Sequence, residues 1–209
     1  MGKYQHGILG GFSGKIGTVI GGRWKGIDYM RSKGRRSFKV PTEKQAIQRA
    51  KFGLVIKFVT ALGDMLTLGF TNASMPMTGI NRAFKYTFEN AITGTYPDFA
   101  IDYSKVLVSE GSVPNVNAVV TSEANSILKA VWPDNTGAKA KADDKCIIVA
   151  YCPELNRAEF VPGAAMRSAA QDTLNLGLFS GKTVETWISF ISTNGEVATS
   201  IYIGQLLIS

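Results

Sequence analysis

The C-terminal half of the chain constrains the fold most strongly, because it is a succession of short β-prone segments separated by turn residues. These segments are 106–109, 117–121, 126–132, 146–152, 158–161, 173–178, 183–192 and 196–204. Seven or eight short strands in about 110 residues are typical of two packed antiparallel sheets. The pattern therefore predicts an immunoglobulin-like or fibronectin-like β-sandwich, in which Trp132 and Trp187 anchor the core.

The turn between the last two predicted strands carries the dipeptide Asn194-Gly195. This dipeptide favours a type I′ hairpin turn, because both central residues of that turn adopt positive φ angles. We therefore expect a type I′ hairpin at this point.

The segment before the predicted sandwich carries the signals of two helices. Thr42 and Gln45 form a capping box after Pro41, and an apolar repeat at helical spacing follows. The positions of that repeat are Ile47, Ala50, Leu54, Val55, Phe58, Leu62, Met65 and Leu66. A second, shorter helix is expected over 80–92, and Gly94 closes it. Its inward-facing positions are Ala83, Phe84, Phe88, Ala91 and Ile92.

The N-terminal part of the chain is rich in glycine and basic residues. Segments 16–24 and 27–32 are apolar and β-prone and flank Lys25-Gly26, which predicts a hairpin. The glycines at 10, 11, 14, 17, 21, 22 and 26 indicate positive φ angles, bulges or another backbone passing close by. An isolated two-stranded ribbon is marginally stable in water, so this arm must pack on the body of the protein or on a neighbouring chain.

The chain as a whole is expected to be α+β and mainly β. We expect a basic glycine-rich β arm over 1–40, a helical segment with one long and one short helix over 41–98, and the antiparallel β-sandwich over 99–209. A chain of 209 residues buries about 70% of its extended surface on folding. A core of this size needs neither a disulfide nor a metal ion.

Charge is divided unevenly along the chain. The first 57 residues contain 13 basic and two acidic residues, whereas the rest of the chain contains 10 basic and 14 acidic ones. The formal charge of +7 is therefore the difference between a basic head and a mildly acidic body. We expect the head to bind the partner. Its candidate binding residues are Lys15, Arg23, Trp24, Lys25, Ile27, Tyr29, Arg31, Lys33, Arg35, Arg36, Lys39 and Arg49.

The supply of catalytic side chains is small. A Ser-His-Asp or Cys-His site would have to use His6, the lone histidine, which lies in a glycine-flanked stretch. Cys146 and Cys152 flank a strand-like run about 20 Å long, which is too far for a disulfide. We interpret them as small buried hydrophobes in a reducing compartment. We therefore expect no enzymatic activity, cofactor, metal ion or small-molecule substrate.

Two segments superficially resemble catalytic motifs. The Gly-Lys pairs at 14–15 and 181–182 resemble a phosphate-binding loop, but Leu9 and Leu176 occupy the position of the glycine that such a loop needs five residues earlier. Asp143-Asp144 lies among lysines, which favours a solvated turn over a metal or acid-base pair.

The distribution of apolar residues bears on localisation. No apolar run approaches the 18 residues of a membrane span, and glycines and a lysine interrupt the first 20 residues where a signal peptide would need an apolar region. We expect a protein that is made in the cytoplasm without a signal peptide, stays out of membranes and enters a virion or particle if it is a structural subunit.

Several ordered motifs resemble those of a family of unknown function from Bacteroidota, DUF6266. The motifs are Gly11-Phe12-Ser13-Gly14-Lys15-Ile16-Gly17 with Val19; Trp24-Lys25-Gly26 with Arg31; Pro41-Thr42-Glu43-Lys44-Gln45 with Arg49, Lys51 and Phe52; Asn90-Ala91-Ile92 with Gly94, Tyr96-Pro97, Ile101-Asp102-Tyr103 and Ser109-Glu110-Gly111; and Ser200-Ile201-Tyr202-Ile203-Gly204. The resemblance implies no particular enzymatic activity, because none is established for the family.

A shorter set of motifs is similar to small structural proteins of tailed phages and prophages. It comprises the Ser-Gly-Lys-x-Gly stretch at 13–17, Pro-Thr-x-x-Gln at 41–45 and Arg-x-Lys-Phe at 49–52. This likeness implies a structural role.

Three functions follow as hypotheses. The first is a non-enzymatic subunit of a virion, tail or similar assembly, which docks on other copies of itself or on other subunits through the arm and buries Trp24, Ile27 and Tyr29. The second is nucleic-acid binding by the head, where basic residues would contact phosphates and aromatic rings would stack on bases. The third is attachment to glycans or surfaces by the sandwich, with Tyr151, Trp187 or Tyr202 stacking on sugars.

Overall fold

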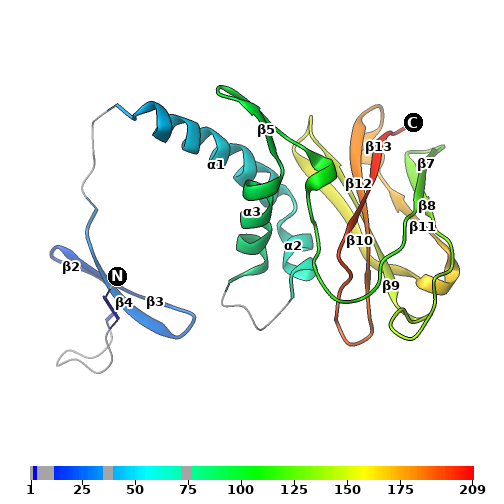
Figure 1. Cartoon of the computed structure of the whole chain (residues 1–209), viewed down its shortest axis with the longest axis horizontal. Coiled ribbons are helices and arrows are strands. Elements are labelled where there is room, and N and C mark those ends of the chain that lie inside the picture. The colour runs from blue at the N-terminus through cyan, green and yellow to red at the C-terminus, as the bar shows by residue number, and fades with distance from the viewer. Residues whose placement is uncertain (1, 4–11, 35–39, 72–76) are drawn as a thin grey trace. The chain divides into compact units, whose positions relative to one another are not determined.

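The protein forms two compact units, Met1–Pro41 and Thr42–Ser209, in the computed structural model (Figure 1). The structure describes residues 2–3, 12–34, 40–71 and 77–209. The N-terminal unit contains an antiparallel sheet, and the C-terminal unit contains the helices and the sandwich.

The N-terminal sheet has four strands in the order β1–β4–β3–β2. They are β1 (Gly2–Lys3), β2 (Gly14–Ile16), β3 (Val19–Trp24) and β4 (Ile27–Ser32). The predicted hairpin is confirmed, because Lys25 and Gly26 link β3 to β4 with φ angles of 47° and 79°, the positive values that a type I′ turn requires. The predicted single strand over 16–24 is wrong. Gly17, with a φ of 56°, turns the chain there and folds β2 back onto β3.

The long helix begins where the sequence predicted it. The Thr42 hydroxyl accepts a hydrogen bond from the Gln45 amide at 3.4 Å, and the Gln45 side chain accepts one from the Thr42 amide at 3.1 Å. The helix α1 (Glu43–Ala61) then bends by 80° at Leu62 into α2 (Gly63–Gly69), so one predicted helix is in fact two. Among the described helices, no single one is long and apolar enough to cross a membrane, although α1 and α2 pass that test when taken together.

The apolar repeat of this helical pair is buried most deeply at its C-terminal end. Val55, Phe58, Leu62, Met65 and Leu66 are buried. The earlier positions of the repeat are half-buried. The repeat therefore marks the side of the helices that packs on the sheet.

The short helix α3 (Gly79–Asn90) ends earlier than predicted. Ile92 begins the strand β5 (Ile92–Thr95), which pairs with β6 (Asp98–Ile101). Gly94 has a φ of 85°, and a Cβ atom there would overlap the Asp98 carbonyl oxygen. This glycine therefore allows the close approach of two strands instead of closing the helix.

The sandwich is confirmed by the strand pairing. Its strands are β7 (Val119–Glu123), β8 (Ile127–Val131), β9 (Lys145–Cys152), β10 (Arg157–Met166), β11 (Gln171–Asn175), β12 (Thr183–Ile191) and β13 (Ile201–Leu207). They form an antiparallel three-stranded sheet, β11–β8–β7, and an antiparallel four-stranded sheet, β10–β9–β12–β13. Short 3-10 helices occur at Tyr103–Lys105, Arg167–Ala169 and Gly177–Phe179.

The eighth predicted strand, 106–109, is not part of either sheet. Val106, Val108 and Ser109 are buried, and the amides of Val108 and Ser109 donate to the Ser200 hydroxyl at 2.9 and 3.3 Å. The segment is apolar because it lies in the core, and its backbone bonds to a side chain in place of a neighbouring strand.

The turn at Asn194-Gly195 closes a hairpin, but its predicted type is wrong. The Gly195 amide donates to the Ser192 carbonyl at 2.9 Å, and the Ser192 amide donates to the Glu196 carbonyl at 2.8 Å. In this turn only Gly195 has a positive φ, 82°. This geometry belongs to a longer loop in which glycine takes the left-handed position, so the Asn194 backbone is not forced out of its common range.

The four-stranded sheet is covered on both faces, which gives the C-terminal unit three layers. Figure 1 shows the helices on one side of this sheet and the three-stranded sheet on the other. Alternate side chains of β9 enter two cores: Cys146, Ile148, Ala150 and Cys152 face the three-stranded sheet, and Ile147, Val149 and Tyr151 face the helices.

Both predicted tryptophan anchors are confirmed. Trp132 packs edge-on against Phe190 at 5.5 Å between the two sheets. Trp187 lies between the four-stranded sheet and the helices, 6.5 Å from the Phe58 ring. Each core therefore contains one buried indole.

A buried ion pair closes one end of the sandwich, and it corrects the prediction that Asp143-Asp144 is a solvated turn. Asp143 is exposed, but Asp144 is buried, and its Oδ2 lies 3.2 and 3.1 Å from Nε and Nη2 of buried Arg167. The guanidinium also donates to Asn135 Oδ1 at 2.7 Å. It lies 3.9 Å from the centre of the Phe190 ring. Sequence distance hid this pair, because its members are 23 residues apart.

We expect Arg167→Met to lower the free energy of unfolding by about 3–5 kcal/mol, because it leaves the Asp144 carboxylate buried without its cation. The matched control is Lys182→Met, which removes the exposed pair with Glu154 and should cost less than about 1 kcal/mol. Urea denaturation of both variants measures the difference. Equal small losses would contradict the expectation.

The two cysteines are free and buried, which confirms their interpretation as small core residues. Burial raises the pKa of the Cys146 thiol, so little of the reactive thiolate forms near neutral pH. We expect no rapid reaction of the native protein with a thiol reagent at pH 8. Two thiols per chain should react after denaturation in urea. Fast labelling of the folded protein would contradict the described packing.

Candidate functional site: the basic aromatic face of the N-terminal sheet

The register of the N-terminal sheet sorts its side chains onto two faces, because directly opposed residues in an antiparallel pair point to the same side. Ile20 lies opposite both Lys15 and Arg31. Trp24 lies opposite Ile27, and Gly22 lies opposite Tyr29. We call this side the basic aromatic face; it carries Lys15, Ile20, Gly22, Trp24, Ile27, Tyr29 and Arg31.

The opposite face has a different character. Arg23 lies opposite Asp28, and their side chains form an exposed ion pair at 3.7 Å. Asp28 is the single acidic residue of 1–41. Its charge is therefore on the side of the sheet that does not carry Lys15 and Arg31.

The adjacent glycines of β3 each make room for one aromatic ring. A Cβ atom on Gly22 would lie 2.8 Å from Oη and 2.9 Å from Cζ of Tyr29, so the tyrosine ring lies across the strand. A Cβ atom on Gly21 would overlap the ring and the carbonyl oxygen of Phe12, on the other face. The predicted close approaches are confirmed at these two glycines, whereas Gly10 and Gly11 lie outside the described residues.

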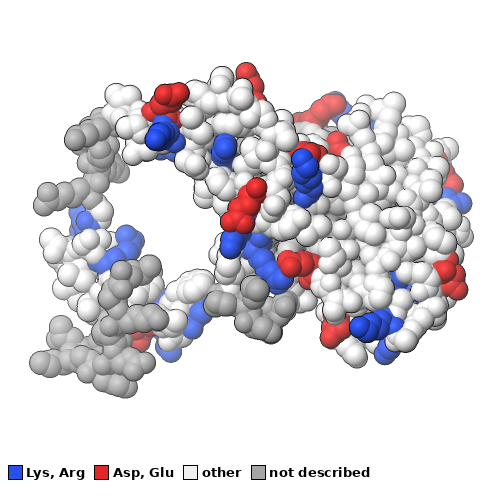
Figure 2. All heavy atoms as spheres, in the orientation of Figure 1, with Lys and Arg blue, Asp and Glu red and all other residues white. Residues whose placement is uncertain are grey.

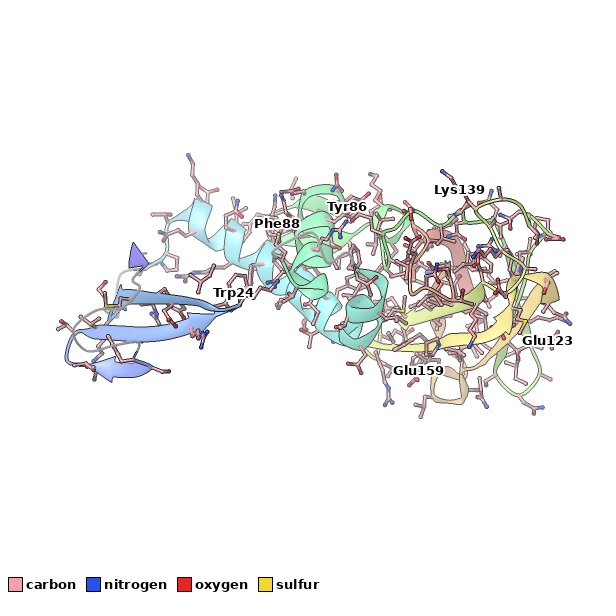
Figure 3. The ribbon with its side chains drawn as sticks, turned by 90° about the horizontal axis from the view of Figure 1, so that it is seen from below. Trp24, Tyr86, Phe88, Glu123, Lys139 and Glu159 are labelled. Atoms are coloured by element: carbon pink, nitrogen blue, oxygen red, sulfur yellow. The ribbon has the colours of Figure 1, made fainter. Side chains whose placement is uncertain are left out.

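The basic aromatic face exposes large apolar side chains. Trp24 is 50% exposed and Ile27 is 42% exposed. Figure 3 labels Trp24, at the end of β3, and Lys25 Nζ lies 5.3 Å from the centre of its ring. Among the described residues of the N-terminal unit, Gly21 alone is buried. The described part of this sheet therefore has no core of its own.

The structure brings together five of the twelve candidate residues from the sequence: Lys15, Trp24, Ile27, Tyr29 and Arg31. Lys25 is in the hairpin turn, and Lys33 follows β4, where its amide donates to the Thr18 carbonyl. Arg23 is on the opposite face, and Arg49 is on α1 in the other unit. Arg35, Arg36 and Lys39 lie outside the described residues, as does His6.

Sequence reasoning missed Ile20 and Gly22. The alternation of Ile20, Gly22 and Trp24 along β3 is the signal that could have found them, because every second residue of a strand shares a face.

The charge of the chain is concentrated around this sheet. Residues 1–41 contain nine basic residues and one acidic residue. Figure 2 shows lysine and arginine side chains on the described part of the N-terminal unit, and charges of both signs over the C-terminal unit. The face therefore suits a partner that is acidic or polyanionic.

The sandwich does not offer the aromatic residues proposed for glycan stacking. Tyr151 and Trp187 are buried under the helices, and Tyr202 is half-buried. Burial and a hydrogen bond to Glu185 raise the pKa of the Tyr202 hydroxyl, which keeps it in its neutral, donating form. These residues are accounted for by the core.

A polar hollow of about 740 Å³ lies beside the β12–β13 hairpin. Several of its lining groups are engaged with one another. Arg82 Nη2 lies 2.9 Å from Glu110 Oε2, and the Ser112 hydroxyl donates to Glu196 at 3.3 Å. Within the described ranges of the chain, no cluster of three or more His, Cys, Asp or Glu side chains could hold a metal ion.

We expect Gly22→Ala to push the Tyr29 ring off the strand, because the new methyl group would occupy its place. The amide chemical shifts of β3 and β4 should change, and the Tyr29 ring resonances should move toward solvent-exposed values. Gly21→Ala meets the Phe12 backbone and should disturb the sheet more, with faster proteolysis of the N-terminal unit. Gly34→Ala, which has nothing within 4 Å of the added methyl group, is the matched control. Identical spectra for all three variants would contradict the ring placement.

Comparison with known proteins places the chain in a family. It matches the model of a family of unknown function, DUF6266, over residues 11–204, and it belongs to that family. The resemblance noted in the sequence is therefore confirmed. No curated protein matches the chain.

Among solved structures, the chain is similar to the fn3 domain of the human collagen alpha-1(XX) chain. The two share 15% identity, with a TM-score of 0.35, over 48% of this chain and 88% of that chain. The sandwich assignment made above rests on the strand pairing.

Proposed function

We propose that this member of the family is a non-enzymatic structural subunit that docks on other subunits through the basic aromatic face. The proposed setting is a repeated position in a phage virion, tail or similar assembly, where the neighbours are copies of the same chain or other structural subunits. The short likeness of 13–17, 41–45 and 49–52 to phage structural proteins supports this setting.

One observation carries the proposal: the basic aromatic face exposes Trp24 and Ile27 on a sheet that has no core in its described part. A sheet with an apolar face is stable when another layer covers that face. Full burial of a large apolar side chain contributes about 2 kcal/mol. A partner surface that covers both residues would therefore stabilise the sheet and bind the chain in the same step.

The non-enzymatic part of the proposal is supported by the supply of side chains. The lone imidazole of the chain is His6, and the buried thiols and tyrosines are part of the two cores.

We expect Trp24→Ala and Arg31→Glu each to weaken binding to the partner subunit at least about tenfold, because both change the docking face. Ile16→Ser and Arg23→Gln are the matched controls, since they alter the opposite face, and they should bind within about threefold of wild type. Co-sedimentation with native particles and sedimentation velocity of purified protein measure binding. A chain that stays monomeric up to millimolar concentration and is absent from every particle fraction would sink the proposal.

A second candidate function is single-stranded nucleic-acid binding by the same face. The rings of Trp24 and Tyr29 lie beside Lys15 and Arg31, which is the combination that stacks on bases and contacts phosphates.

Fluorescence anisotropy with single-stranded DNA and RNA distinguishes this candidate. If Lys15, Lys25 and Arg31 each neutralise a phosphate, affinity should fall roughly 20-fold between 50 and 200 mM salt. Trp24→Ala should weaken binding at both salt concentrations. Absence of binding at 50 mM salt would remove this candidate and leave the docking proposal intact.

A further inference from the structure

The charge of the basic aromatic face limits what can cover it. Lys15 and Arg31 lie on either side of Ile20 on this face, and Lys25 is in the adjoining turn. Two copies of this face packed against each other would bring like charges together, which is destabilising. A second copy must therefore meet this face with a different surface.

The distribution of charge selects the part of the second copy. Residues 42–98 contain six basic and four acidic residues, whereas residues 99–209 contain eight basic and eleven acidic ones. The helical segment thus adds to the positive charge of the N-terminal unit. The sandwich opposes it, and it is the complementary surface on this chain.

One sheet face of the sandwich is uncovered. The helices cover the outer side of the four-stranded sheet, whereas the outer side of β11–β8–β7 is open. On that side Val119 lies directly opposite Val131, and the two are 68% and 44% exposed. We call it the valine face; it carries Val119, Thr121, Glu123, Ile127, Lys129, Val131, Gln171, Thr173 and Asn175.

Resting on the proposed function, we infer that the basic aromatic face of one copy packs on the valine face of a second copy. Sheet-on-sheet packing buries the apolar residues of both faces, Trp24 and Ile27 against Val119 and Val131. Because the two surfaces differ, each copy keeps one free donor face and one free acceptor face. Such a head-to-tail contact forms open chains or rings, which is what a repeated structural subunit requires.

The size of the faces sets the strength of a single contact. Strands spaced about 4.8 Å apart and about 20 Å long give each face an area on the order of 400 Å². The total of about 800 Å² is below that of a standard stable interface. A single contact is therefore weak, and assembly depends on high local concentration or on many contacts in series.

The test uses one donor variant and one acceptor variant of the full chain. The donor variant is Trp24→Ala with Arg31→Glu, and the acceptor variant is Val119→Lys. Sedimentation velocity from 10 μM to 1 mM should show growing oligomers for wild type and monomers for each variant alone. Mixed in equal amounts, the two variants should form a dimer and no longer species, because each supplies the face that the other lacks.

Matched controls separate surface effects from misfolding. Ile16→Ser changes the opposite face of the N-terminal sheet, and Leu155→Lys places a lysine on an exposed apolar side chain elsewhere on the sandwich. Both should assemble within about threefold of wild type. Val131→Lys is a second acceptor variant, and circular dichroism reports whether each protein is folded.

The outcomes distinguish this inference from the proposed function. The inference is overturned if folded Val119→Lys and Val131→Lys assemble like wild type, if the mixed variants stay monomeric, or if wild type is monomeric at 1 mM. Loss of particle binding in the donor variant alone would then leave the proposed function standing with another acceptor. Both fail if the donor variant changes no association with protein.

Discussion

The two central strands of the four-stranded sheet, β9 and β12, are buried on both faces, and the organisation of the C-terminal unit depends on this. From Cys146 to Cys152 every residue of β9 is buried, and so is every residue from Val184 to Phe190 of β12. Strands of this kind cannot face water on either side, because both sets of alternating side chains need a cover. One cover is the three-stranded sheet and the other is the helices. The helices are therefore an essential layer of the fold.

This two-sided burial also decides which surfaces are left for binding. In a two-layer sandwich the outer faces of both sheets are open. Here α1, α2 and α3 occupy one of them, and Trp187 and Tyr151 point into that layer. The segment 106–109 is held against the sandwich by serine contacts, with the Ser109 and Ser189 hydroxyls 2.7 Å apart. The open sheet faces of the described chain are then the valine face and the basic aromatic face.

Features fixed by neighbouring residues could be predicted from the sequence, whereas features fixed by distant partners could not. The Thr42–Gln45 capping box and the Lys25-Gly26 turn depend on a few adjacent residues, and both were predicted correctly. Asp144 was misjudged because its partner Arg167 comes from another part of the chain. The end of α3 was misjudged because Gly94 serves the pairing of β5 with β6, which the helical pattern does not reveal.

The candidate site divides in the same way. Its composition was visible in the sequence, since basic and aromatic residues alternate with glycines over 12–33. Its sidedness was not, because the register of β2 against β3 depends on the turn at Gly17. A shift of one residue there would exchange the faces, and Ile16 would replace Lys15 beside Ile20. The small turn glycine thus determines which side of the N-terminal sheet is cationic, and with it the kind of surface that can bind there.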